Sequence, residues 1–177
     1  MTSKDLITEL YIGYFGRAPD PVGLTFWITV LENGLTLEEI AQDFAVQAEA
    51  QATYAFLSGD PTVSETADVE AFVTAIYGNL FDREPEPDGL NFWTEVLQDG
   101  FPVGTFILAI IDGASDADAA VLANKTEVAC AWSDAAGGED GFVLTDAYLE
   151  ESAAALDAVS ADPATVMAGK ETAALFF

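Results

Sequence analysis

Apolar residues recur at helical spacing in three successive segments near the N-terminus. The first stripe covers residues 6–15 and the second covers residues 24–31. The third follows Thr36, which lies three residues before Glu39, the spacing of a capping box. Apolar positions three and four residues apart lie on one face of a helix. The pattern therefore predicts three amphipathic helices joined by short corners.

This pattern occurs twice. The stretch FGRAPDPVGLTFW at residues 15–27 is matched by FDREPEPDGLNFW at residues 81–93, at an offset of 66. Identical residues occupy 12 of the 24 positions between Tyr11 and Gly34 at this offset. A period of this length indicates a duplicated supersecondary unit. We expect the copies at about residues 6–45 and 72–111.

The remainder of the chain also has helical character. Residues 115–133 predict a long helix, and the segment SDAAGGEDG at 133–141 is typical of a flexible linker or turn. Two alanine-rich helices are expected at about 145–159 and 163–175, the second opened by an Asp162-Pro163 cap.

No segment shows the alternation typical of a strand. We therefore predict an all-α fold in which a duplicated three-helix unit is joined by further helices in a multi-helix bundle. Residues 1–135 form the duplicated domain in this interpretation. Residues 142–177 form a C-terminal helical segment that packs on the same domain or stands apart from it.

The corner between the first two helices of each copy contains residues that favour the start of a helix. Asp20 precedes Pro21, so its side chain is placed to cap the second helix while proline occupies the first helical position. Glu86 takes the same place in the second copy. Gly23 and Gly89 lie inside the second helix, where glycine costs about 1 kcal/mol relative to alanine, so we expect a packing reason for both.

The charge of the chain excludes several classes of partner. Its 31 acidic and five basic residues give a formal net charge of −26. Nucleic acid is disfavoured because phosphate binding needs a stripe of lysine and arginine. No run approaches the roughly 20 apolar residues of a membrane span, so we expect no membrane insertion. Self-repulsion should also make the compact state favour screening salt or divalent cations.

Little in the sequence supports catalysis. The chain has no histidine, and Cys130 lies in a helical stretch with no base to activate it. The segment DGASDAD places Asp112, Asp116 and Asp118 close together, so these oxygens are candidate calcium ligands, although the spacing is not that of an EF-hand. Helix capping is the alternative role. The expected cofactor is accordingly none, or Ca²⁺.

Arg17 and Arg83 are the candidate binding residues, because they occupy matched positions and are two of only five cations. In one interpretation each guanidinium binds carbonyl groups at the end of the first helix, or a nearby carboxylate. In the other interpretation, each arginine contacts an anion or a glycan, once in each copy, with Asp20 and Glu86 beside them. Trp27 and Trp93 lie on apolar helix faces and are expected in the core.

The doubled pattern F-[GD]-R-x-P-x-P-x-G-L-x-F-W resembles a bacterial family catalogued as domain of unknown function 4214. The segment VLANKTEVACAW, with Asn124, Lys125 and Val128, is similar to a second motif of that family. A related pattern occurs in helical domains that anchor alphaproteobacterial S-layers to lipopolysaccharide. The resemblance implies an extracellular or cell-surface protein of a type I-secreted class, and the ending from Glu171 to Phe177 agrees with a signal for that route.

Two functions from different classes follow. The first is a non-enzymatic surface protein that associates with the cell envelope or an S-layer-like assembly through polysaccharide and calcium. The second is a helical protein–protein interaction or self-assembly module, with a protein partner or a homo-oligomer as its product. An enzyme with an unrecognised carboxylate site is a third, weaker hypothesis.

Overall fold

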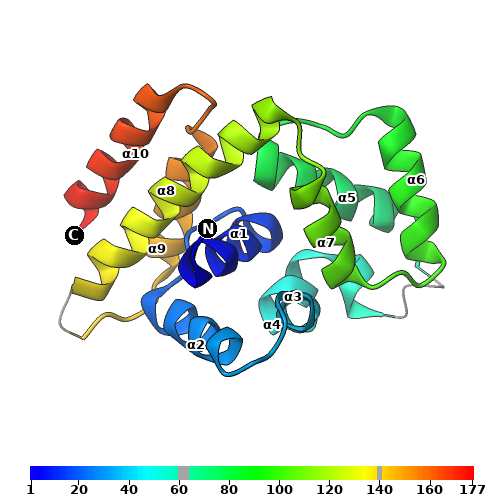
Figure 1. Ribbon diagram of the computed structural model, residues 1–177, viewed down its shortest axis with the longest axis horizontal. Coiled ribbons are helices and arrows are strands. Elements are labelled where there is room, and N and C mark those ends of the chain that lie inside the picture. Colours follow the sequence, from blue (N-terminus) through cyan, green and yellow to red (C-terminus); the bar gives the residue numbers. More distant parts are fainter. Residues whose placement is uncertain (60–63, 139–140) are drawn as a thin grey trace.

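The described part of the protein is helical, as the apolar periodicity predicts. The structure is a computed structural model that describes residues 1–59, 64–138 and 141–177, and these residues contain ten α-helices and no strand (Figure 1). The first copy comprises α1 (Ser3–Phe15), α2 (Pro21–Glu32), α3 (Leu37–Ala45) and α4 (Ala48–Thr53), followed by a 3₁₀ turn at Ala55–Ser58. The second comprises α5 (Thr66–Phe81), α6 (Pro87–Gln98), α7 (Val103–Asp112) and α8 (Asp116–Gly138). The chain continues with α9 (Asp146–Asp157) and α10 (Pro163–Phe176).

Local signals in the sequence set most helix boundaries. The side chain of Thr36 accepts a hydrogen bond from the Glu39 amide, and the Glu39 carboxylate accepts one from the Thr36 amide, which confirms the predicted capping box. Asp162 accepts from the Ala164 amide at 2.9 Å and caps α10 as predicted. The second helices end beside Gly34 and Gly100, whose φ angles of 109° and 88° suit glycine.

The predicted linker at residues 133–141 is wrong over residues 133–138, which belong to α8; residues 139–140 lie outside the described part. The glycines at 137 and 138 weaken a helix intrinsically. Burial of Ser133 and Ala136 against neighbouring elements outweighs that preference. Packing thus extends α8 by a turn beyond its predicted end.

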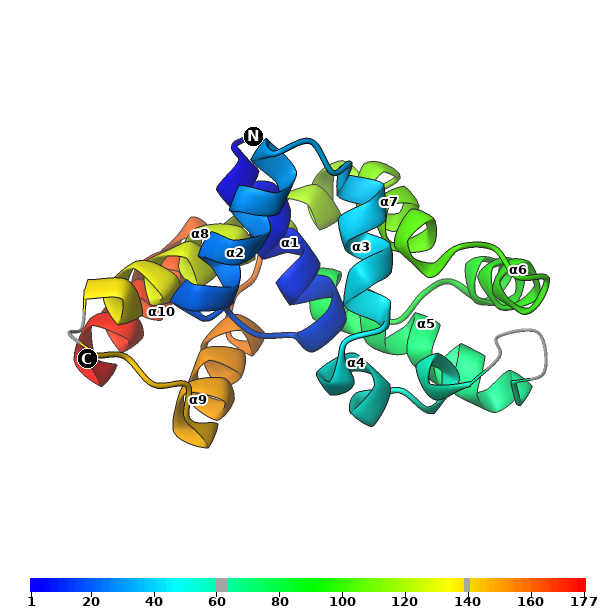
Figure 2. The ribbon, with the colours of Figure 1, turned by 90° about the horizontal axis from the view of Figure 1, so that it is seen from below.

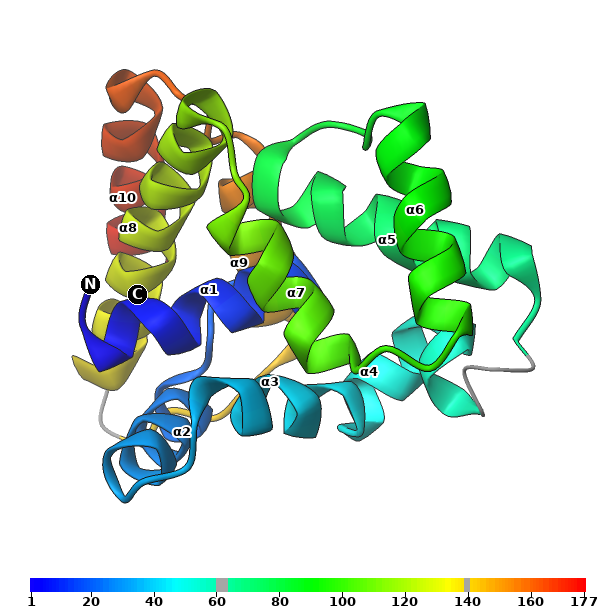
Figure 3. The ribbon, with the colours of Figure 1, turned by 45° about the vertical axis from the view of Figure 1, so that its right-hand side comes forward.

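Matched helices of the two copies pack against each other. α1 contacts α5 and α3 contacts α7, so each copy meets the other through the same two elements (Figures 2 and 3). Asn79 donates from Nδ2 to the carbonyl oxygen of Gly13 at 2.9 Å, and these residues occupy the same position in the two copies, 66 residues apart. Each copy thus meets the other through matched elements, as two like subunits do in a self-complementary interface. Neither copy alone could bury these helix faces.

The long helix α8 joins the halves and carries the C-terminal helices. It packs on α1, α2 and α5 on one side, and on α9 and α10 on the other (Figure 1). The hydroxyl of Tyr148 in α9 donates to the carbonyl of Pro19 at 2.7 Å. The rings of Phe176 and Phe177 lie 5.1 and 6.0 Å from that of Trp132. Residues 142–177 therefore pack on the duplicated domain.

The crossing of α3 and α7 depends on a glycine. A Cβ atom on Gly104 would lie 2.5 Å from the backbone nitrogen of Gln42 and 2.9 Å from the carbonyl oxygen of Glu38. The Gly104 amide also donates to Gln42 Oε1 at 3.0 Å. Only glycine lets the two backbones come this close.

We expect Gly104→Ala to destabilise the protein by about 1–3 kcal/mol, because the added methyl group must push two backbones apart. Gly89→Ala is the matched control: no atom lies within 4 Å of a Cβ there, and the change should stabilise by about 0.4–1 kcal/mol. Urea unfolding of both variants measures the two free energies. A neutral Gly104→Ala would contradict the close approach.

Candidate functional site: two corners and an uncharged helix face

The corner arginine of the first copy is bound inside the protein. Arg17 donates from Nε and Nη2 to the two oxygens of Glu49 in α4, at 2.8 and 2.6 Å, and from Nη1 to the carbonyl of Ala18 at 2.8 Å. The guanidinium carbon lies 5.3 and 5.2 Å from the ring centres of Tyr11 and Phe15. Arg17 is only 4% exposed. One side chain therefore connects the end of α1, the turn and α4.

The second copy repeats these contacts with a different acid. Arg83 donates from Nε and Nη2 to the two oxygens of Asp118 in α8, at 2.8 and 2.9 Å, and from Nη1 to the carbonyl of Glu84 at 3.0 Å. It also lies over the rings of Tyr77 and Phe81. The hydrogen bonds from Arg83 lower the pKa of Asp118, and Asp118 in turn raises the pKa of Arg83.

These contacts match the packing interpretation of the arginines, and in each copy the carboxylate comes from a fourth helix that follows the three-helix unit. The fourth helices, α4 and α8, hold the same place relative to their corner arginine. An external anion at either guanidinium would have to displace a two-point carboxylate partner. Arg83 is the more accessible of the two, with its side chain 35% exposed and a further contact to Glu86 at 3.0 Å.

The acids of the corner act at the start of the second helices. Asp20 accepts from the amide of Gly23 at 2.8 Å and so caps α2, as predicted. Glu86 occupies the N-cap position of α6 without a side-chain cap, and binds Arg83 instead. The expectation of a packing reason is confirmed at Gly23, where a Cβ would lie 2.3 Å from the Tyr11 hydroxyl, and is wrong at Gly89, which faces open space.

The predicted calcium cluster is not assembled. Asp112 and Asp116 are exposed, whereas Asp118 is buried and uses both carboxylate oxygens on Arg83 and on the hydroxyl of Ser115. Within the described residues there is no group of three acidic, cysteine or histidine side chains placed to hold a metal ion. The structure thus gives Asp118 the corner role that Glu49 has in the first copy.

Lys125 has a structural role that sequence reasoning missed. It is 1% exposed and donates to Asp82 Oδ1 at 2.6 Å and to the carbonyl of Asn79 at 2.8 Å. Asp82 ends α5 in the left-handed conformation, with φ at 56°, where the first copy has Gly16. A buried lysine thus satisfies the end of α5 and holds a non-glycine residue in that conformation. Its place within the second motif of the family resemblance was the only signal available.

The second helices differ most on their outer surfaces. The outer surface of α2, here called the α2 outer face, consists of Val22, Thr25, Phe26 and Thr29, all exposed and uncharged. The equivalent positions of α6 are Asp88, Asn91, Phe92 and Glu95, also all exposed. Phe26 and Phe92 are 56% and 55% exposed. The two faces share an aromatic residue and differ in charge.

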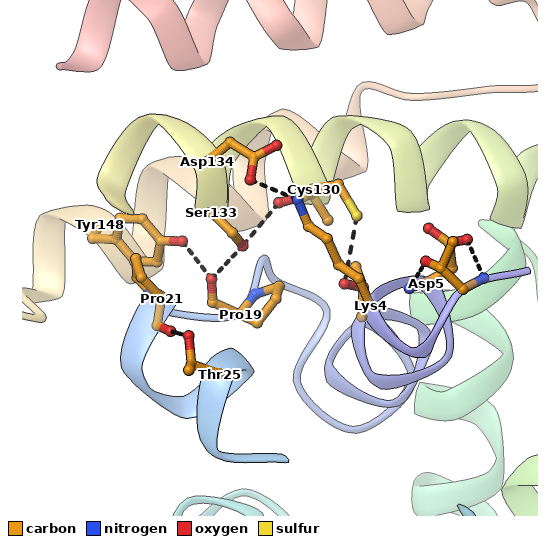
Figure 4. Close-up of polar contacts among 12 residues, drawn as sticks. Lys4, Asp5, Pro19, Pro21, Thr25, Cys130, Ser133, Asp134 and Tyr148 are labelled. Atoms are coloured by element: carbon orange, nitrogen blue, oxygen red, sulfur yellow. Dashed lines mark hydrogen bonds and ion pairs between the residues drawn. The ribbon is translucent and has the colours of Figure 1, made fainter. Parts of the chain in front are cut away.

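Two hollows border this region. A groove of about 470 Å³ lies between α2 and α8, with Leu24 and Ile28 among its apolar walls. Figure 4 shows its polar side, where Lys4 binds Asp134 at 2.6 Å and Ser133 donates to the carbonyl of Pro19. A smaller hollow of about 220 Å³ at the first corner is lined by Arg17, Asp20 and Trp27 among others.

The two tryptophans close each corner from the inside. Trp27 lies 5.0 Å from the ring of Phe44 in α3, and Trp93 lies 5.1 Å from the ring of Phe106 in the matched helix α7. Both are partly buried and pack against the core, as expected. Their packing fixes the rotation of α2 and α6 about their own axes, and so decides which residues form the outer faces.

A family model described as a domain of unknown function (DUF4214) matches residues 1–54 and 61–114. The first match spans α1 to α4, and the second spans α5 to α7. No curated protein and no solved structure is similar enough to the chain to count as a match. In the part of the chain that the structure describes, the helices are too short or too polar to cross a membrane.

The corner ion pair of the first copy can be tested through its exposed partner. Glu49→Gln leaves the buried Arg17 without a charged acceptor, and we expect a loss of about 1.5–3 kcal/mol, the usual contribution of hydrogen bonds to a charged group. Glu86→Gln is the control, because its side chain is 70% exposed and such pairs contribute at most about 1 kcal/mol. If both substitutions lower the free energy of unfolding in urea by the same amount, the ion pair between Arg17 and Glu49 does not hold α4 in place.

Proposed function

The chain belongs to the DUF4214 family, and on that premise we propose that it is a non-catalytic assembly module whose copies pair through their α2 outer faces. The observation that carries this proposal is an exposed, uncharged, partly aromatic helix face on a chain with a net charge of −26. Exposed apolar surface of this kind is typical of interaction sites.

The charge of the chain supports a second copy of the same chain as the partner that covers the α2 outer face. Two molecules of this charge repel wherever carboxylates approach each other. The α2 outer face contributes no charge to such a contact, and the only charged residue of α2 is Glu32 at its end. The equivalent face of α6 carries Asp88 and Glu95, so pairing there would bring four carboxylates together. Self-association is therefore least opposed at α2.

The shape around α2 supports the same contact. In a two-fold pair the same surface serves both partners, so Phe26 of each copy meets the other copy's α2 region. The groove between α2 and α8 lies beside this face and shares Thr25 with it. An aromatic side chain seated in a partly apolar groove is the usual energetic centre of a protein interface. α6 lies far from α2 in all three views, so its face remains outside the contact (Figures 1, 2 and 3).

The second part of the proposal places this assembly at the cell envelope, outside the cell. It rests on the resemblance to surface-associated domains and stays a prediction. Because the chain is so acidic, attachment to an anionic polysaccharide needs a bridging divalent cation. The described residues hold no preformed cluster of three metal ligands, so calcium would have to be shared between protein and polysaccharide carboxylates or phosphates.

The pairing is tested by sedimentation velocity over a range of protein concentrations, at about 0.1 M and about 1 M NaCl, where the Debye lengths are about 10 and about 3 Å. We expect a monomer–dimer equilibrium that shifts toward dimer at high salt. Phe26→Glu should weaken dimerisation at least about tenfold, because two buried like charges are added to the contact. Phe92→Glu is the matched control and should leave the dimer unchanged.

A monomer at every concentration, or equal effects of the two substitutions, would contradict the pairing. Envelope attachment has its own measurement: co-sedimentation with outer-membrane vesicles that carry or lack O-polysaccharide, in calcium and in chelator. We expect binding only with polysaccharide and calcium. Binding that ignores both would remove the bridging mechanism.

A further inference from the structure

A second groove lies between α1, α8 and α10. Its volume of about 530 Å³ is within the range of small-molecule sites. α1 contributes Asp5 and Glu9, α8 contributes Ala123, Ala131 and Cys130, and α10 contributes Lys170. Of its lining residues only Asp134 is shared with the groove beside α2.

Glu9 is the unusual residue of this groove. It is 5% exposed, and it makes no hydrogen bond or ion pair with any residue in the described part of the chain. The other acids of the groove all have partners: Glu127 binds Lys170, Asp134 binds Lys4 at 2.6 Å, and Asp5 accepts from the Thr2 amide at 2.7 Å. The Glu9 carboxylate oxygens still reach the groove, so they take their hydrogen bonds from whatever occupies it, whether water or a ligand.

We propose that this groove binds a small organic cation, a primary alkylammonium group whose nitrogen contacts the Glu9 carboxylate and whose carbon chain lies along the alanine-lined wall of α8. We expect a positive occupant, because the four carboxylates of Asp5, Glu9, Glu127 and Asp134 are only partly offset by three positive groups: Lys4, Lys170 and the N-terminal ammonium of Met1. It must have an apolar part, because Ala123 and Ala131 give that wall nothing to hydrogen-bond with their side chains.

A metal ion fits this groove less well than an ammonium group. Metal ions such as calcium take six to eight oxygen ligands, and the described residues offer no cluster of three metal-binding side chains. An ammonium group needs only one carboxylate and a few further acceptors. The Cys130 thiol in the groove wall stays protonated and adds no negative charge, because burial raises its pKa. Its sulfur lies 3.6 Å from the hydroxyl of Thr8.

The ionisation of Glu9 links this binding to pH. Burial, together with the nearby charges of Asp5 and Asp112, raises the pKa of Glu9 to about 7. The other titratable groups around the groove are Glu127, Cys130 and Asp134 of α8, Lys170 of α10 and the N-terminal amino group of Met1, whose charge lowers the pKa of Glu9. A bound cation favours the ionised carboxylate. Binding near pH 7 should therefore release a proton from Glu9.

The test is calorimetric titration of the whole chain with n-hexylammonium chloride, with 1-hexanol as the uncharged ligand of the same chain length. We expect hexylammonium to bind at least about tenfold more tightly than hexanol. Its affinity should rise about tenfold from pH 6 to pH 8, as Glu9 goes from mostly protonated to mostly ionised. Glu9→Gln should lose the preference for the cation and the pH dependence, whereas the exposed control Glu95→Gln should keep both.

Equal binding of the two ligands, or equal binding by wild type and Glu9→Gln, would overturn the proposal. So would an affinity of the wild type that is flat between pH 6 and pH 8, which decides the matter even where Glu9→Gln does not fold.

A second measurement uses stability alone. Because the folded state holds the Glu9 proton more tightly than the unfolded state, the Glu9 contribution to stability is fully present below its unfolded pKa and is lost as pH rises through about 7. We expect Glu9→Gln to gain stability relative to wild type between pH 5 and pH 8 in urea unfolding. A constant difference between the two proteins would mean that Glu9 is not a buried, unpaired carboxylate.

Discussion

Each half of the molecule is organised by one guanidinium. Arg17 and Arg83 each bind a carboxylate at two points, a turn carbonyl and two aromatic rings, so each fixes the end of one helix, the following corner and the start of the fourth helix. The buried member of the pair differs between the copies: the arginine in the first, the aspartate in the second. In both cases the more exposed partner keeps the buried charge compensated, which is the condition under which a buried ion pair is tolerated. The direction of α2, and hence of its outer face, follows from this clamp.

Local physics was sufficient to predict most of the fold from the sequence. Apolar spacing, the Thr36 capping box and the Asp162 cap depend on residues within a few positions of each other, and all three are confirmed. The short helix α4 was missed because its six residues carry no apolar stripe, and Arg17 reaches it from 32 residues away. The same limit explains Gly89 and the end of α8. The atoms around a glycine and the surface that buries a helix end are set by tertiary packing. A short stretch of sequence does not contain that information.

The candidate site was predictable in position but not in chemistry. The matched arginines and acids stand out in the repeat, and the structure does bring Arg17 and Asp20 to one hollow. Their partners, Glu49 and Asp118, lie in helices of 6 and 23 residues that do not align at the repeat offset. Glu9 could not be recognised from the sequence for a related reason. In a chain with 31 acids, one more carboxylate on a helix carries no signal until its burial and lack of a partner are known.

Divergence between the two copies, rather than the shared fold, gives the molecule its distinct surfaces. The fourth helix of the second copy, α8, is much longer than α4 of the first copy. Its residues line both the groove beside α2 and the groove that contains Glu9. The two grooves meet only at Asp134, whose ion pair with Lys4 is exposed and so contributes little energy. Occupation of one groove can therefore change the other only weakly. The proposed self-association at α2 and the proposed cation binding at Glu9 therefore use surfaces that share only Asp134 among their lining residues.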